Sequence, residues 1–230
     1  MLSIPPATDV PVLVPWRTDN GPREQIWRRL QRDVWAGWRV VASDHDGTAF
    51  SRAAARNQAA RQAGDWQVAI LADADSIVPP GRLHAAIDLA LSSGRMVIAH
   101  DRWVNVRPDE QADFLTSWCV QYTPEREVFP LTVGSMLVVP RAVWDAVGGQ
   151  DERMTGYGYE DNAFHRACAI LTGDPLRLSG SVWHFADDPV RPTLSEQLRS
   201  PDTRRNRDLW QRYRRVTTPA AMRALLAERP

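Results

Sequence analysis

The stretch Val68-Ala69-Ile70-Leu71-Ala72-Asp73-Ala74-Asp75 decides the fold. Its first five residues form a continuous apolar run, short enough for a β-strand that is buried on both faces. Two carboxylates follow at once, where open α/β sheets place their ligands. Asp73 and Asp75 are two residues apart, so both can face one oxygen-preferring cation such as Mg²⁺ or Mn²⁺. A strand that ends in an ordinary polar turn explains the same residues, because Asp is common in turns.

The pattern of a strand followed by a polar turn occurs twice before this stretch. Strands are predicted over residues 10–14 and 38–42, and they lead into the polar turns 17–19 and 44–46. Helices are predicted over residues 23–35, 51–63 and 80–93, and a fourth strand over 96–99. This β-α-β-α-β-α-β order predicts a doubly wound, mostly parallel sheet with flanking helices. The polar turns then share the edge of the sheet where nucleotides bind.

The second half of the sequence is less regular. Residues 103–130 are predicted to be a long excursion without repeated βα units. Further predicted elements are a strand over 132–139, helices over 140–147 and up to 171, a strand over 176–183 that delivers His184, and helices over 203–215 and 220–227. No linker is evident, so we predict one domain over residues 1–190, with a regular first half over about 9–100 and a less regular second half over about 101–190. Residues 191–230 are predicted to be an Arg-rich helical extension packed on that domain.

Composition excludes several classes of protein. The 230 residues carry no formal net charge, so no overall field attracts nucleic acid or a membrane surface. All 28 basic residues are Arg, which excludes mechanisms that need a lysine amine. Cys119 and Cys168 lack metal-site spacing, and no apolar run approaches the roughly 20 residues of a membrane span. With no signal-peptide pattern at the start, we expect a cytoplasmic protein.

The order of these features resembles the glycosyltransferases of the GT-A fold. Asp73-Ala74-Asp75 resembles their D-x-D motif, and the helix that contains Arg56-Asn57 resembles the preceding helix of family 2 members. Gly148-Gly149-Gln150-Asp151-Glu152, followed by Gly156-Tyr157-Gly158-Tyr159-Glu160-Asp161, is similar to the galactosyltransferase-type segment G-G-x-D-E…G-W-G-x-E-D. The resemblance covers about residues 9–186. Tyr157 replaces the usual Trp, and Asn162 replaces a third acid found in some members, which leaves the sugar and the acceptor open.

The resemblance implies a metal-dependent hexosyltransferase with a Rossmann-like GT-A domain. Residues 9–100 would form its nucleotide-sugar half, and residues 101–190 its acceptor half. The enzyme would move a sugar from a nucleotide-diphosphate sugar, with a UDP-sugar expected, to an acceptor hydroxyl with inversion. Asp75, His184 and Asp73 are the implied ligands of Mn²⁺ or Mg²⁺, and Asp73 would also contact the ribose or sugar. A neutral imidazole beside carboxylates suits Mn²⁺, although a lone His at a strand end is often structural.

Asp161 is the predicted general base, because inverting transfer needs a carboxylate to take the acceptor's proton. A helix amino terminus favours an ionised carboxylate, and glycine permits close approach of a sugar. The predicted sugar-binding residues are Glu160, Tyr157, Gly158 and Tyr159. First-turn acids with a purely structural role would explain the two carboxylates but not the glycines and tyrosines before them.

The nucleotide is expected at the ends of the first three strands. Its predicted contacts are Pro15, Arg17, Asp44, Asp46, Arg56 and Asp73. A solvated turn is the alternative for each of the acids. The C-terminal arginines suit a diphosphate or a polyanionic acceptor such as DNA, but equally a solvated helix face.

Two rival functions remain open. Asp44-His45-Asp46-Gly47-Thr48 also fits the D-x-D-G-T nucleophile motif of haloacid-dehalogenase-like phosphatases, although these enzymes usually need a later Lys. A non-catalytic module that binds nucleotide sugars is the second rival. The acceptor itself is undetermined: a glycan, a small molecule, a protein or a modified DNA base are all compatible with the sequence.

Overall fold

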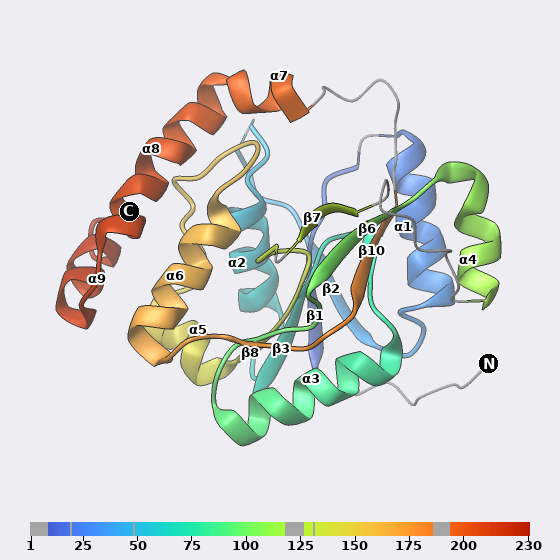
Figure 1. Cartoon of the computed structure of the whole chain (residues 1–230), viewed down its shortest axis with the longest axis horizontal. Coiled ribbons are helices and arrows are strands. Elements are labelled where there is room, and N and C mark those ends of the chain that lie inside the picture. The colour runs from blue at the N-terminus through green and yellow to red at the C-terminus, as the bar shows by residue number, and fades with distance from the viewer. Residues whose placement is uncertain (1–8, 19, 48, 118–126, 131, 186–193) are drawn as a thin grey trace.

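The computed structural model describes residues 9–18, 20–47, 49–117, 127–130, 132–185 and 194–230. Its centre is a sheet with the strand order β2-β1-β3-β8-β5-β9 (Figure 1). The strands are β1 (Pro11–Pro15), β2 (Arg39–Ser43), β3 (Val68–Ala72), β5 (Val97–Ile98), β8 (Met136–Pro140) and β9 (Leu176–Arg177). β8 runs antiparallel to both of its neighbours, and the other five strands share one direction. The prediction of a mostly parallel α/β sheet is therefore confirmed.

β3 lies between β1 and β8, and both of its faces are covered. Ile70 pairs with Val12 of β1, and Ala72 pairs with Met136 of β8. Val68, Ile70 and Ala72 belong to one hydrophobic core, whereas Ala69 and Leu71 belong to the core on the opposite face. Burial on both faces explains why the strand reads as an unbroken apolar run rather than as an alternation.

Helices cover the two faces of this sheet (Figure 1). They are α1 (Pro22–Asp33), α2 (Arg52–Gln62), α3 (Pro80–Ser93), α5 (Arg141–Val147) and α6 (Glu160–Thr172). α1 and α3 pack on one core, and α2, α5 and α6 pack on the other. The hydroxyl of Ser51 accepts the amide of Ala54 and caps α2, and Gly94 ends α3 in the left-handed region. Such local signals explain why the predicted helices of the first half are confirmed.

A second sheet, with the order β4-β10-β6-β7, corrects two predictions. Its strands are β4 (Ser76–Ile77), β10 (Ser181–Phe185), β6 (Arg102–Val106) and β7 (Glu127–Pro130). The predicted excursion 103–130 thus contains β6 and β7, with a 3₁₀ turn (Pro108–Glu110) and α4 (Gln111–Ser117) between them. The predicted strand 176–183 is wrong as one element, because Gly180, at φ +122°, separates β9 in the central sheet from β10 in the second.

The start of β8 also differs from the prediction. The expected strand 132–139 begins only at Met136, because Ser135 has a φ of +68° and breaks the extended backbone before it.

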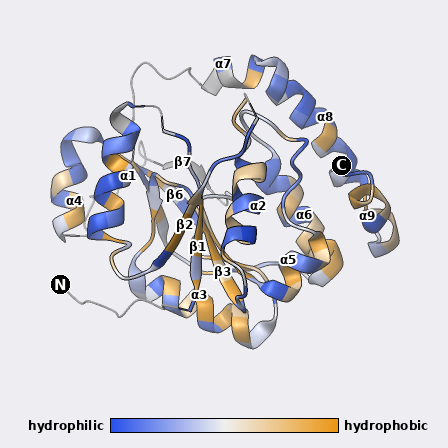
Figure 2. Cartoon of the chain, turned by 180° about the vertical axis from the view of Figure 1, so that it is seen from behind, coloured by the Kyte–Doolittle hydropathy of each residue, from blue (hydrophilic) through white to orange (hydrophobic). Residues whose placement is uncertain are grey.

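The C-terminal residues form α7 (Leu194–Arg199), α8 (Pro201–Arg215) and α9 (Pro219–Leu226). α8 runs along α6 at the outer side of the molecule and is largely hydrophilic (Figures 1 and 2). Tyr213, Met222 and Leu225 nevertheless join the core beneath α6. None of the described helices combines the length and apolarity that crossing a membrane requires.

Candidate active site

The two carboxylates that follow β3 have different partners. Asp73 forms an ion pair with Arg56, and its backbone amide donates to the carbonyl of Ser135 at 3.0 Å. Burial raises the pKa of Asp73, although the Arg56 guanidinium acts against that rise. The carboxylate of Asp75 instead faces His184, with 3.6 Å between Oδ2 and Nε2. The D-x-D residues therefore lie at one strand end but serve two clusters.

His184 is held so that one ring nitrogen faces Asp75. The backbone amide of Phe185 donates to the carbonyl of Asp75 at 2.8 Å, which ties β10 to the D-x-D turn. Nδ1 of His184 lies 2.9 Å from Oδ1 of Asn105 on β6, and the Trp103 ring packs 4.5 Å from the imidazole. In the tautomer that carries its proton on Nδ1, His184 donates a hydrogen bond to Asn105. The lone pair of Nε2 then points toward Asp75.

Asp75 and His184 together supply some, but not all, of the ligands that a metal site requires. A carboxylate oxygen and an imidazole nitrogen are donors that suit Mn²⁺. Within the described part of the chain, no three His, Cys, Asp or Glu side chains converge closely enough to hold a metal by themselves. Two protein ligands are compatible with a cation that also takes oxygens from a diphosphate and water.

Arg56 of α2 connects Asp73 to the predicted base. Only 1% of its side chain is exposed. One terminal nitrogen contacts Asp73, and the other donates to Oδ1 of Asp161 at 2.8 Å. Gln150 also bonds to both residues, because its Oε1 lies 3.3 Å from Arg56 and its Nε2 lies 3.2 Å from Asp161 Oδ1. A buried cation requires such partners, so Arg56 fixes the positions of both carboxylates.

Asp161 lies in the first turn of α6 and remains partly accessible, with 19% of its side chain exposed. Gly134, just before β8, makes room for it. A Cβ added to Gly134 would lie 2.3 Å from Oδ2 of Asp161. A side chain at position 134 would therefore displace the carboxylate of the predicted base.

Glu160 is more deeply buried than Asp161 and forms an ion pair with Arg52. Its side chain is 4% exposed, and its Oε1 lies 2.5 Å from the Arg52 guanidinium. Burial raises the pKa of Glu160, against the opposing effect of Arg52. The same guanidinium lies 5.6 Å from the centre of the Tyr157 ring, and Tyr157 is one of the few exposed large apolar side chains. Arg52 thus joins the two predicted sugar-binding residues Glu160 and Tyr157.

The backbone before α6 has an unusual conformation. Gly156, Gly158 and Tyr159 have φ values of +69°, +90° and +75°. The first two positions therefore suit glycine, whereas Tyr159 adopts a left-handed conformation that L-residues rarely occupy. We call residues Gly156–Tyr159 the acceptor loop, because the predicted sugar-binding tyrosines lie in it.

The predicted nucleotide contacts near β1 and β2 meet in one cluster. The Nε of Arg17 donates to Asp44 Oδ2 at 2.7 Å, and Nη2 of Arg17 donates to the carbonyls of His45 and Gly47. Partial burial raises the pKa of Asp44, but the bonds from Arg17 and the His45 amide outweigh it and leave the pKa below its ordinary value. Pro15 pairs with Ser43 at the same edge, and Asp46 is exposed. Asp19 lies outside the described residues.

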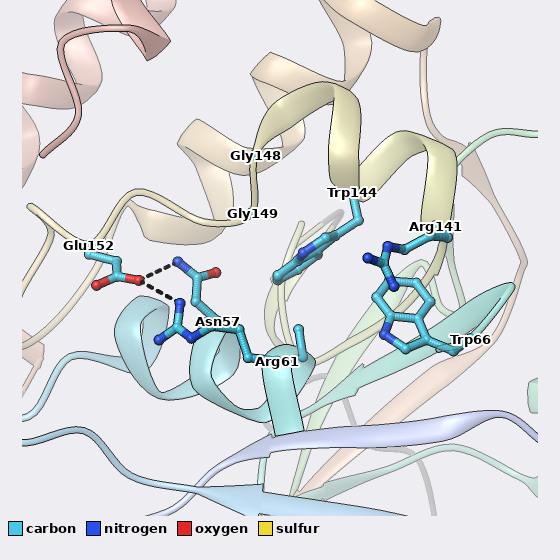
Figure 3. Close-up of a pocket in the computed structure, with 9 residues that line it drawn as sticks. Asn57, Arg61, Trp66, Arg141, Trp144, Gly148, Gly149 and Glu152 are labelled. Atoms are coloured by element: carbon cyan, nitrogen blue, oxygen red, sulfur yellow. Dashed lines mark hydrogen bonds and ion pairs between the residues drawn. The ribbon is translucent and has the colours of Figure 1, made fainter. Parts of the chain in front are cut away.

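A cavity of about 210 Å³ lies elsewhere, between α2 and α5 (Figure 3). Its lining includes Asn57, Trp66, Trp144 and Glu152. Asn57 accepts from the backbone amide of Gln150 and donates to its carbonyl, each at 2.9 Å, and it also donates to Glu152. This cavity is separate from the carboxylate cluster, but its wall fixes the backbone of Gln150, whose side chain contacts Asp161.

Several residues of the cluster were not predicted from the sequence. They are Arg52, Asn105, Gly134 and Gln150. Gln150 lies inside the Gly-Gly-Gln-Asp-Glu motif, and Arg52 lies one turn before Arg56 on the same helix, so both had a local signal. Asn105 and Gly134 lie in segments without a recognisable pattern, and only the tertiary structure brings them to the site.

Comparisons with known proteins support the fold. No family model and no curated protein matches the sequence. Three solved structures have a similar fold. They are Drosophila β1,4-galactosyltransferase 7 with manganese, UDP-Gal and xylobiose (18% identity, 84% of this chain and 80% of that one, TM-score 0.50), a Pyrobaculum calidifontis mannosyltransferase with GDP-Man and Mn²⁺ (14%, 95% and 68%, 0.54), and GalNAc-T7 with UDP, GalNAc and Mn²⁺ (15%, 90% and 44%, 0.55). The chain has the GT-A fold of nucleotide-sugar glycosyltransferases.

Proposed function

We propose that this chain is a metal-dependent glycosyltransferase that moves a hexosyl group from a nucleotide-diphosphate sugar to an acceptor hydroxyl with inversion. The observation that carries the proposal is the bridge made by Arg56, which holds Asp73 at the end of β3 and Asp161 at the start of α6. This bridge joins a donor side and an acceptor side in one cluster of charges. The GT-A fold supports the same assignment.

Asp75 and His184 are the residues that would hold Mn²⁺ or Mg²⁺. Their donor atoms face each other, and Asn105 orients the imidazole. When bound, the cation would neutralise negative charge on the departing diphosphate. Asp73 is predicted to contact the donor ribose or sugar and to lie near the cation, while Arg56 fixes the direction of its carboxylate.

Asp161 would act as the base. Arg56 and Gln150 bind Oδ1, and none of the described residues donates a hydrogen bond to Oδ2, which Gly134 leaves room for. Oδ2 would accept the proton of the acceptor hydroxyl while that oxygen forms a bond to the anomeric carbon. The bond from this carbon to the diphosphate oxygen breaks at the same time, and the nucleoside diphosphate leaves with its electron pair.

The donor and acceptor are less defined than the reaction. A UDP-sugar is the first donor to test, since two of the similar structures hold UDP or UDP-Gal. Glu160, Tyr157, Gly158 and Tyr159 would contact the donor sugar or the acceptor, which can be a glycan, a small molecule, a protein or a modified DNA base. Arg17, Asp44 and Pro15 would line the nucleotide side.

The phosphatase alternative has less support. Its nucleophile would be Asp44, but Arg17 binds that carboxylate directly, at 2.7 Å. No observation in the described residues favours it over transfer, and it leaves Asp161, Asp75 and His184 without a role.

Thermal unfolding with nucleotides tests the proposal. UDP with Mn²⁺ should raise the melting temperature, because a ligand at about 100 times its Kd stabilises the folded state by about 2.7 kcal/mol. Asp75→Asn should lose the part of this shift that requires Mn²⁺. The matched control is Asp88→Asn, an exposed position on α3, which should respond like the wild type. The absence of a shift with any nucleotide diphosphate, together with hydrolysis of a simple phosphate ester, would overturn the proposal in favour of the phosphatase.

A further inference from the structure

The carbonyl groups of the acceptor loop are bound by α8, a helix that starts about 40 residues later in the sequence. Nδ2 of Asn206 donates to the carbonyls of Thr155 at 2.8 Å and Gly158 at 3.0 Å, and lies 3.3 Å from that of Tyr157. The hydroxyl of Thr203 donates to the carbonyl of Tyr157 at 2.9 Å. Both side chains are almost fully buried, at 2% and 1% exposed.

The loop depends on these bonds because of its backbone conformation. Its three residues of positive φ belong to no regular element. The carbonyl of Tyr159 accepts the amide of Ala163 in α6, but the carbonyls of Tyr157 and Gly158 are outside any ladder of hydrogen bonds. A buried carbonyl that loses its hydrogen-bond partner destabilises the fold. Gly156 also permits the close approach of α8, since a Cβ there would lie 3.2 Å from the side chain of Asp202. Helix and loop therefore fit each other by both shape and hydrogen bonding.

α8 is itself firmly attached to the domain, as a positioning element must be. Ser200 caps its amino terminus by accepting from the amide of Thr203. Near its other end, the hydroxyl of Tyr213 donates to Asp151 Oδ2 at 2.7 Å, and Arg229 donates to Tyr213 at 2.9 Å. Burial raises the pKa of Tyr213 to about 12, so the phenol keeps the proton that it donates at every pH where the enzyme would work.

We propose that Asn206 and Thr203 are positioning residues for glycosyl transfer. They fix the acceptor loop in its left-handed conformation, and the loop fixes where Glu160 and Asp161 begin α6. The C-terminal segment is then part of the active-site architecture rather than an appended basic arm. The inference rests on the proposed function for its catalytic consequence, but the effect on the loop stands independently of it.

Asn206→Ala and Asn206→Asp test the proposal. The first removes the amide, and the second keeps its size but replaces the donating nitrogen with an oxygen that repels the carbonyls. Hydrolysis of UDP-sugar in the presence of Mn²⁺ should fall by about 10- to 100-fold in kcat, because small displacements of a catalytic group have effects of this size. The melting shift caused by UDP and Mn²⁺ should be unchanged, since Asp75 and His184 belong to the turn after β3 and to β10 rather than to the acceptor loop.

Two further comparisons separate positioning from general instability. Leu225→Ala in α9 opens the core next to α6 and lowers stability, but it removes none of the hydrogen bonds from α8 to the loop. Its kcat should therefore stay near that of the wild type below its melting temperature. Thr203→Val should slow hydrolysis, and Thr203→Ser, which keeps the hydroxyl, should restore it. Amide hydrogen exchange over residues 154–160 should accelerate in Asn206→Ala but not in Leu225→Ala.

The outcomes distinguish this inference from the proposed function. Unchanged loop exchange in Asn206→Ala, or an equal loss of kcat in Leu225→Ala, would overturn the positioning role. A wild-type protein that neither binds UDP with Mn²⁺ nor hydrolyses any nucleotide sugar would overturn the proposed function and the catalytic consequence together. In that case the hydrogen-exchange comparison still decides whether α8 holds the loop.

Discussion

The two sides of the candidate site are positioned in different ways. Asp73 and Asp75 follow a strand whose neighbours on both sides fix it residue by residue, as in the pairs Leu13–Leu71 and Met136–Ala72. Asp161 follows a loop that is outside both sheets, and it is fixed by side chains such as Arg56, 105 residues earlier in the sequence. The proposed donor side is thus built by backbone pairing, and the proposed acceptor side by side-chain contacts. Single substitutions should consequently disturb the acceptor side more easily than the donor side.

Arg56 contacts carboxylates on both sides of the site, so its replacement should lower the free energy of unfolding the most. Arg56→Met removes a buried cation and with it the guanidinium that pairs with both Asp73 and Asp161. Breaking a buried ion pair on one side costs about 3–5 kcal/mol, and urea unfolding followed by Trp fluorescence would measure it. The control is Arg61→Met on the same helix, because the Arg61 side chain is 61% exposed and its Nη1 lies 3.7 Å from Oε1 of Glu152. It should cost at most about 1 kcal/mol; equal losses would contradict the bridging role of Arg56.

Gly134→Ala should affect the acceptor side alone. The added methyl group would meet Oδ2 of Asp161, so the carboxylate must move, at a cost of about 1–3 kcal/mol in stability and a clear fall in UDP-sugar hydrolysis. Gly94→Ala is a suitable control, because it places Ala at a φ of +65° in an open position at the end of α3. That strain should cost about 1–2 kcal/mol and leave hydrolysis unchanged. Similar hydrolysis by both variants would mean that Asp161 tolerates displacement.

A smaller effect should appear as a dependence of stability on pH. His100 is fully buried and bonds the carbonyl of Gly134 at 2.9 Å, and burial lowers its pKa from 6.5 to about 4. Between these values the unfolded chain binds a proton that the folded chain excludes. The contribution of His100 is therefore fully present above pH 6.5 and is lost as the pH falls toward 4, by at most about 1.4 kcal/mol per pH unit.

Urea unfolding of the wild type and of His100→Gln at several pH values would measure this contribution. The amide of Gln can still donate to Gly134 but does not titrate in this range. The free energy of unfolding should fall more steeply in the wild type below pH 6.5. Parallel curves for the two proteins would show that His100 is protonated in the folded state as well.

The difference between the two sides also explains what the sequence could predict. β3, α2 and α3 are set by local signals: an apolar run, the Ser51 cap and the Gly94 stop. These signals also place the D-x-D motif at the carboxyl edge of the parallel strands. The sequence predicts that Arg17 and Asp44 lie at the same edge of the sheet. The structure adds a direct hydrogen bond between them.

The acceptor side could not be derived in the same way. β6 and β7 form a sheet with β4 and β10, and such pairings between distant segments leave no periodic signal in a single sequence. Gly180 transfers the chain from one sheet to the other, which a continuous pattern from 176 to 183 conceals. The hydrogen bonds from Asn206 to the acceptor loop depend on how α8 packs. The sequence of α8 does not distinguish polar residues that are buried from those that are solvated.

The central claim, transfer chemistry with Asp161 as the base, is tested most directly by turnover of a UDP-sugar with Mn²⁺ in the wild type and in Asp161→Asn. Asn keeps the size of the side chain and can still bond to Arg56, but it cannot take a proton. We expect a fall in kcat of about 10²- to 10⁴-fold in Asp161→Asn with UDP binding retained. The control Asp174→Asn, at an exposed position after the far end of α6, should show no fall. Equal turnover by the wild type and Asp161→Asn would contradict the central claim.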